Sequence, residues 1–245
     1  MKLLPNCNAY STKLIMKKIV FLITSMSLII ASTSFGQLKI KDIKAGKLID
    51  VVTGTILTNQ IILVDSNLII TIGNNIVIPN NAEIIDLSKA TVLPGLMDCH
   101  THLSFESGEN YYGDIFRKSA IDYAILAPTY AKRTLEAGFT MTRDVGSDQL
   151  IDVSLRNTIN AGSIVGPRML ISTFALGSTG WHADLSGLNP NIEFKGNKDF
   201  TGVADSVDEI RKRIRNNIKW GADRIKSMAS GGVLSEEVSR NQVMS

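Results

Sequence analysis

The hydrophobic and polar positions follow two different patterns along the chain. Up to about residue 90, short β-rich runs alternate with turn residues, and the runs lie at 47–52, 55–57, 60–65, 67–72 and 82–86. Breaks such as Thr53-Gly54 and Gly73-Asn74-Asn75 are typical of hairpins between strands that are rich in β-branched residues. This pattern predicts a small β-domain over residues 37–90.

After residue 91, short apolar strands alternate with helical stretches, which favours β/α units around a parallel sheet. The predicted strands lie at 91–96, 139–144, 168–172 and 224–228, and the predicted helices at 115–137, 149–160 and 207–220. Ser206 and Glu209 form a capping box for the last helix, and Gly221 is placed to end it. Pro128 should kink or split the first helix.

The sequence therefore predicts an α/β fold in which about four β/α units follow the small β-domain. An eight-fold barrel typically needs about 250 residues, whereas only residues 91–245 follow the β-domain. A parallel half-sheet would expose two edges and one apolar face, which natural folds avoid. We expect residues 91–245 to be the first half of a (β/α)8 barrel, truncated, with the other half outside this sequence.

The N-terminal segment has the pattern of a signal peptide over residues 1–36. The basic sequence Met16-Lys17-Lys18 precedes an apolar run over residues 19–31, and a small residue, Gly36, follows. The run is shorter than the roughly 20 residues that cross a bilayer as a helix. We expect cleavage before Gln37, a secreted or periplasmic protein, and no stable membrane insertion after cleavage. The alternative is an uncleaved N-terminal anchor.

Charge and cysteine content restrict the possible partners. The formal net charge of +3 depends on residues 1–36, which contain four lysines and no acidic residue. The mature chain is therefore close to neutral and lacks the basic surface of a nucleic-acid-binding protein. Cys7 and Cys99 lie on opposite sides of the predicted cleavage site, so the mature chain has no intramolecular disulfide.

The strongest motif for chemistry is Leu93-Pro94-Gly95-Leu96-Met97-Asp98-Cys99-His100-Thr101-His102. Residues two apart on a strand face the same side, so His100 and His102 can offer imidazole nitrogens to one metal ion. Two of the three histidines of the chain lie here, at the end of an apolar strand. The alternative is a pair of polar residues at a strand end without a metal.

This segment resembles the first-strand signature of the amidohydrolase superfamily. Three further segments resemble, in order, its second, third and fourth strands: Gly138-Phe139-Thr140-Met141-Thr142-Arg143-Asp144-Val145-Gly146, Gly166-Pro167-Arg168-Met169, and Gly221-Ala222-Asp223-Arg224-Ile225-Lys226 through Ser230-Gly231-Gly232. The fourth is similar to the imidazolonepropionase-like and prolidase-like branch. The resemblance covers residues 40–245.

The resemblance implies a distorted β/α barrel with a companion β-sandwich and one or two divalent metal ions, usually Zn2+. It implies His100, His102 and Lys226 as metal ligands, with Lys226 a carboxylated, catalytic lysine between two ions. An ammonium cannot bind a cation, but a desolvated neutral lysine can take up carbon dioxide and become an anionic oxygen ligand. Alternation with Arg224 and Met228 puts Lys226 on the barrel face. The alternative is a surface or salt-bridged lysine.

The same resemblance implies a substrate-binding role for a second group of residues: His182, Ser230, Gly231 and Gly232. Trp181 departs from the family's T-G-G-H pattern, which leaves a structural loop histidine as the alternative for His182. Asp144 closes its strand on the side of the metals and could orient a ligand histidine. A structural role together with Arg143 is the alternative for Asp144.

The implied mechanism is attack of a metal-bound hydroxide on an amide or ester carbonyl. The substrate would be a small molecule or a dipeptide, with an Xaa-Pro dipeptidase as the main hypothesis and a cyclic amide or imidazolone hydrolase as the runner-up. The family also uses two later histidines and a late aspartate, which are not among these 245 residues. A non-catalytic secreted remnant is the alternative from another class. The sequence is compatible with a homo-oligomer.

Overall fold

The computed structural model describes residues 40–106, 111–180, 182, 184, 191 and 201–229. The chain divides into two compact units, Met1–Pro94 and Gly95–Ser245. The predicted signal peptide lies outside the described residues. Within the ranges just given, no helix has both the length and the apolar character that a membrane span requires.

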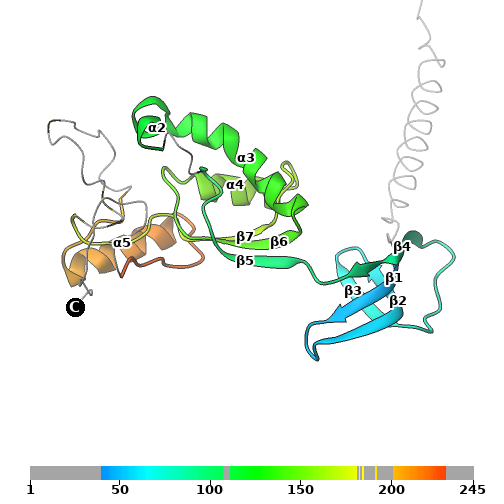
Figure 1. Ribbon diagram of the computed structural model, residues 1–245. Coiled ribbons are helices and arrows are strands. Elements are labelled where there is room, and N and C mark those ends of the chain that lie inside the picture. Colours follow the sequence, from blue (N-terminus) through cyan, green and yellow to red (C-terminus); the bar gives the residue numbers. More distant parts are fainter. Residues whose placement is uncertain are drawn as a thin grey trace, which may run out of the picture. The chain divides into compact units, whose positions relative to one another are not determined.

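The first unit, the β-unit, is a four-stranded sheet in the order β3-β2-β1-β4 (Figure 1). Its strands are β1 (Ile40–Asp50), β2 (Thr55–Asp65), β3 (Leu68–Gly73) and β4 (Glu83–Val92). Neighbours β1 and β2, and also β2 and β3, are antiparallel, whereas β4 runs parallel to β1. The described part of this unit contains one sheet, so the second sheet of the implied sandwich is not among these residues.

Two turn predictions in the β-unit had different outcomes. The turn at Gly54 joins β1 to β2 as expected, with the Gly54 N–H donating to the Asp50 carbonyl at 2.8 Å and a φ of 71°. The hairpin predicted at residues 73–75 is wrong, because β4 pairs with β1 and not with β3. A parallel partner requires a crossover. The runs 55–57 and 60–65 belong to one strand, β2.

The core of the β-unit is small and apolar. Three buried residues form it, Ala45, Leu48 and Ile62, and partly buried apolar residues pack against them. Gly46 lies where the register of β1 against β4 shifts, and a Cβ there would be 2.0 Å from the Ser88 carbonyl oxygen. Only glycine allows this close approach of two strands.

The second unit, the α/β-unit, contains a parallel sheet in the order β5-β6-β7. Its strands are β5 (Leu96–Thr101), β6 (Phe139–Asp144) and β7 (Arg168–Ile171). The predicted bounds of β6 are confirmed. The first strand starts at Leu96 instead of residue 91, because residues 91 and 92 are the end of β4. Pro94, which has no N–H for a ladder, lies between the two strands.

Four helices accompany this sheet: α2 (Tyr111–Arg117), α3 (Ala120–Glu136), α4 (Ile151–Asn160) and α5 (Val207–Lys219). Pro128 lies inside α3 and does not split it, so a split at this residue is wrong. The break falls at Ser119, which caps α3: its hydroxyl accepts from the Asp122 N–H and its own N–H donates to the Asp122 carboxylate. This capping box separates α2 from α3.

The end of the described chain is less regular than predicted. The Ser206 hydroxyl caps α5 by accepting from the Glu209 N–H at 3.3 Å, but the Glu209 carboxylate accepts from Asp205 instead of completing the box. Gly221 follows the helix with a φ of 101°, as expected for a helix-ending glycine. The strand predicted at 224–228 is represented by a single parallel bridge between Leu176 and Ser227.

Helices α3 and α4 pack on one face of the sheet, against β6 and β7 respectively (Figure 1). The buried residues between them are apolar: Leu103, Ala127, Ala131, Ile151, Leu155, Met169 and Ile171. The carboxyl ends of three parallel strands therefore lie at one edge of the sheet, where the segments after β5, β6 and β7 begin. Ligand sites in parallel α/β sheets form at this edge.

Candidate metal and active site

His100 and His102 lie at the carboxyl end of β5, and their ring centroids are 5.6 Å apart. Between the pairs Asp98–Thr142 and Thr101–Asp144, β5 has one residue more than β6, which is a β-bulge at the first histidine. Bulges bend a strand and re-aim its side chains, and they occur often beside active sites. The two imidazoles are thereby brought together at the strand end, as the spacing predicted.

The backbone holds His102 in one tautomer. Its Nδ1 lies 2.8 Å from the carbonyl oxygen of Gly146, at the end of β6. A carbonyl only accepts hydrogen bonds, so Nδ1 carries the proton and Nε2 keeps its lone pair. Burial lowers the pKa of His102, and the nearby His100, Lys226 and His182 lower it further, against the opposing effect of the Gly146 hydrogen bond. A neutral ring with a free Nε2 is a suitable metal ligand.

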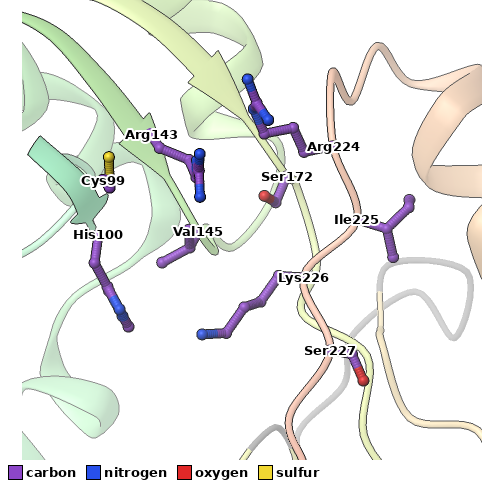
Figure 2. Close-up of a pocket in the computed structure, with 9 residues that line it drawn as sticks. All are labelled: Cys99, His100, Arg143, Val145, Ser172, Arg224, Ile225, Lys226 and Ser227. Carbon is purple, nitrogen blue, oxygen red and sulfur yellow. The ribbon is translucent and has the colours of Figure 1, made fainter. Parts of the chain in front are cut away.

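Lys226 faces His100 across a pocket of about 410 Å³. Figure 2 shows the Lys226 side chain and the His100 ring extending into the same space, while the Cys99 thiol points the other way. The pocket is lined by Cys99, His100, Arg143, Val145, Ser172, Arg224, Ile225, Lys226 and Ser227. The Lys226 backbone is held by the Leu176 N–H, which donates to its carbonyl at 2.8 Å.

His182 is close enough to His102 to lower its pKa. Its Nδ1 is buried and has no hydrogen-bond partner in the described structure. The structure thus brings His100, His102, Lys226 and His182 together from three separate segments of the chain. The other predicted substrate-binding residues, Ser230, Gly231 and Gly232, lie outside the described residues.

Asp144 is fully buried at the end of β6, and burial raises its pKa to about 8. Its Oδ2 accepts from the Leu103 N–H at 2.6 Å. The carboxyl group therefore holds the backbone directly after His102, whereas the ring itself donates to Gly146. The Asp144 carboxyl group therefore contacts the segment that carries the histidines at a backbone N–H, and not at an imidazole nitrogen.

A strained residue after β7 was not identified from the sequence. Thr173 is buried with a φ of 57°, a left-handed conformation that is rare for a β-branched residue and costs of order 1–3 kcal/mol. Its N–H donates to Asp152 Oδ2 at 2.9 Å, and its carbonyl accepts from the Ser147 N–H. No sequence signal marks Thr173, because threonine normally favours extended backbone. Gly146, by contrast, ends the motif at residues 138–146, and that motif could have identified it as a site residue.

The side chains of His100, His102 and Lys226 provide only part of the ligand set that a divalent metal ion needs. The residues of known placement include no cluster of three or more His, Cys, Asp or Glu side chains that could hold a metal. His100 and Lys226 line one pocket, the His102 ring lies beside that of His100, and imidazole is a ligand that zinc prefers. An anionic oxygen at Lys226 would complete the set, as carboxylation would supply.

The residues 91–243 match the family model described as "Amidohydrolase family", and the chain belongs to that family. Members of this family generally use divalent metal ions. Among curated relatives, the chain is 32% identical to the ochratoxinase of Aspergillus niger over 234 residues, which cover 87% of this chain and 46% of that protein. The chain spans about half the length of the curated relatives that it matches.

Solved structures give the same assignment. One is a Xaa-Pro dipeptidase with methionine bound in its active site: 36% identity, a TM-score of 0.73, and coverage of 80% of this chain and 48% of that one. Another is a prolidase in complex with N-methylphosphonate-L-proline: 30% identity, a TM-score of 0.73, and coverage of 84% and 51%. A. niger ochratoxinase follows at 28% identity and a TM-score of 0.65, covering 82% and 49%.

Proposed function

We propose that the whole protein is a metal-dependent hydrolase of amide C–N bonds, with dipeptides as the main substrate class. The observation that carries the proposal is the His102 tautomer, which leaves Nε2 as an acceptor beside His100. His100 in turn shares a pocket with Lys226. Membership of the amidohydrolase family supports it, as do the relatives named as a Xaa-Pro dipeptidase and a prolidase.

Three residues would hold the metal: His100 and His102 through imidazole nitrogens, and Lys226 through a carbamate. Zn2+ is the ion that we propose, because it binds both imidazole nitrogen and carboxylate oxygen. A divalent ion at this position supplies a Lewis acid for the substrate carbonyl and lowers the pKa of water. The Gly146 carbonyl keeps the His102 ring in the tautomer that such an ion requires.

Carboxylation of Lys226 would require only the uncharged amine and carbon dioxide. The neutral amine attacks the carbon of carbon dioxide, so that the N–C bond forms while one C–O π bond breaks. The nitrogen then gives one proton to water, and the product is a carbamate with two oxygens and one negative charge. Arg143 and Arg224 line the same pocket. Positive charge in the pocket would stabilise the negative charge of a carbamate.

The remaining site residues would either contact the substrate or hold the protein backbone in place. His182 has a buried nitrogen without a hydrogen-bond partner among the described residues, which supports a contact between this ring and a polar group of the substrate. Ser230, Gly231 and Gly232 would extend the substrate-binding loop beyond Lys226. Asp144 would keep the Leu103 backbone in place behind the histidine pair.

The test of this function uses Lys226→Ala in the full-length protein. We expect loss of one metal ion per subunit and a fall in turnover on Xaa-Pro dipeptides of about 100-fold or more, since loss of an outer-shell partner alone costs 10- to 100-fold. Acetate or propionate should restore part of both, because a small carboxylate can occupy the vacated space with the right charge. Lys212→Ala, on the exposed side of α5, is the matched control.

Two results would contradict the proposal. One is a Lys226→Ala enzyme with unchanged metal content and turnover. The other is a mass spectrum or crystal structure of the active enzyme in which the Lys226 amine is unmodified beside bound metal. A substrate panel that includes cyclic amides separates dipeptidase activity from the runner-up activity.

The proposed enzyme is exported. The N-terminal pattern supports cleavage before Gln37. N-terminal sequencing of protein recovered outside the cytoplasm should start at or near Gln37, and an intact Met16 would contradict cleavage.

A further inference from the structure

The segment that presents Lys226 is tied to helix α4 by an ion pair outside the pocket. Arg156 Nη1 lies 2.8 Å from Asp223 Oδ2 and 2.7 Å from the Gly221 carbonyl oxygen. The Arg156 side chain is only 14% exposed, and that of Asp223 is 35% exposed. One guanidinium thus holds both the end of α5 and the residue three positions before Lys226.

Asp223 also connects this segment to β7. Its Oδ2 accepts from the Ile171 N–H at 3.0 Å, and its own N–H donates to the Ile171 carbonyl at 2.9 Å. The Arg224 N–H donates to the same carbonyl at 3.2 Å. A single carboxylate oxygen therefore joins α4, the last residue of β7 and the segment that leads to Lys226.

These contacts replace the ladder of a regular strand. In the described chain, residues 224–228 form no named strand, only the bridge between Leu176 and Ser227. The second attachment is at Leu176, which donates to the Lys226 carbonyl and accepts from the Met228 N–H, both at 2.8 Å. Lys226 lies two residues after the first attachment, and its own carbonyl is part of the second. Loss of the first would leave its register to one short bridge.

The residue types suit this junction. Arginine can donate to a carbonyl and a carboxylate at once through a rigid planar fork, which a lysine ammonium cannot reproduce. Gly221, with a φ of 101°, gives the guanidinium room, since a Cβ there would lie 3.2 Å from Arg156 Nη2.

We propose that Arg156 and Asp223 are positioning residues for Lys226. They set the register and direction of the segment, so that the Lys226 side chain reaches the space shared with His100. This inference rests on the proposed role of Lys226 as a metal ligand. Neither residue lines the pocket; each acts through the backbone of residues 221–226.

The test measures metal content and turnover in full-length variants. For Asp223→Ala and Arg156→Met we expect about one metal ion fewer per subunit and a 10- to 100-fold fall in kcat, the range for outer-shell partners of metal ligands. KM should change less than about 3-fold, since these side chains do not line the pocket. Acetate should restore nothing, because Lys226 still occupies its place. Arg156→Lys and Asp223→Asn should lie between these variants and wild type.

Two controls separate positioning from general loss of stability. Asp208→Asn removes an exposed ion pair with Arg211 on α5 and should leave metal content and kcat unchanged. Ile62→Ala removes part of the core of the β-unit and should lower the midpoint of thermal unfolding without loss of metal. Wild-type metal content and kcat in folded Asp223→Ala and Arg156→Met would overturn the inference.

The outcomes also distinguish this inference from the proposed function. If Lys226→Ala loses metal while the Arg156 and Asp223 variants do not, only the positioning role fails. If Lys226→Ala keeps full metal and turnover, the proposed function fails first. Should Asp223→Ala not fold, Asp223→Asn and Arg156→Lys decide the question by the same two measurements, and wild-type values in both would overturn it.

Discussion

The two units of the chain bury different kinds of side chain. The described core of the β-unit is apolar, around Leu48 and Ile62, and its one fully buried acid is Asp42. The α/β-unit buries an apolar core and, in addition, many polar residues: Thr101, Ser104, Thr142, Asp144, Ser147, Asp152, Ser172, Thr173 and Asn217. Most of these polar residues lie at or after the carboxyl ends of the three strands.

This difference distinguishes the β-unit from the unit that contains the candidate site. A buried polar group costs free energy unless it is hydrogen-bonded, so its retention needs a geometric reason. In the α/β-unit the bonds of Asp144, Asp152 and Asn217 go to the backbone of segments that follow strands. They hold these segments in single conformations. We expect changes in the β-unit to alter stability alone, and changes in the α/β-unit to alter metal binding as well.

The largest effect is expected for His102→Ala in the full-length protein. Loss of a nitrogen ligand should remove metal and lower turnover by more than about 100-fold. Ile62→Ala in the β-unit is the counterpart and should retain full metal content. Metal analysis and turnover of both variants check this comparison. Equal metal loss in the two would contradict the division of roles.

A matched pair of glycines gives the next effect. A Cβ at Gly202 would lie 1.7 Å from the Ala175 carbonyl oxygen, and one at Gly46 would lie 2.0 Å from that of Ser88. Both alanine variants should lose roughly 1–3 kcal/mol or more of stability through overpacking. Only Gly202→Ala should also lose metal, because Ala175 precedes the residue that binds the Lys226 backbone. Thermal unfolding and metal analysis, done together, measure both quantities.

Core truncations should produce a smaller effect on function. Ile171 is 0% exposed, whereas Ile62 is 6% exposed. Each change to alanine should lower the free energy of unfolding by about 2–5 kcal/mol. Ile171→Ala should reduce turnover further, since loss of packing at β7 would shift the Ile171 backbone, whose carbonyl accepts from the Asp223 and Arg224 N–H groups. Denaturant unfolding with parallel kinetics tests this; equal turnover in the two variants would show that packing at β7 does not affect Lys226.

The smallest effect is a change in pH dependence at Asp152. Burial raises the pKa of this carboxyl group from 3.8 to about 6. The folded state then binds the proton more tightly than the unfolded state, so this group makes the free energy of unfolding fall as pH rises from about 4 to about 6. The slope contributed is at most about 1.4 kcal/mol per pH unit. Asp152→Asn should remove this slope, whereas Asp208→Asn should leave it unchanged.

Local sequence signals predicted most elements of the α/β-unit. The bounds of β6 agree with prediction, and α4 and α5 agree to within two residues, because apolar periodicity and caps act over one or two turns. The break at Ser119 was missed because its capping partner is an aspartate instead of the usual Glu or Gln. The partner of β4 was missed because strand pairing depends on which edge the crossover reaches.

The sequence by itself indicated the His100–His102 pair, since residues two apart on a strand face the same side. The structure adds the register shift between Asp98 and Thr101 and ends the strand before His102. The sequence also determined the order of the β/α units and the glycine that ends α5. Only the tertiary structure decided which atom faces the His102 Nδ1, where the Asp144 carboxyl group bonds, and that Arg156 meets Asp223. These contacts join residues 41 to 67 positions apart. Local periodicity does not encode such distances; they arise when separate strand ends meet at one edge of the sheet.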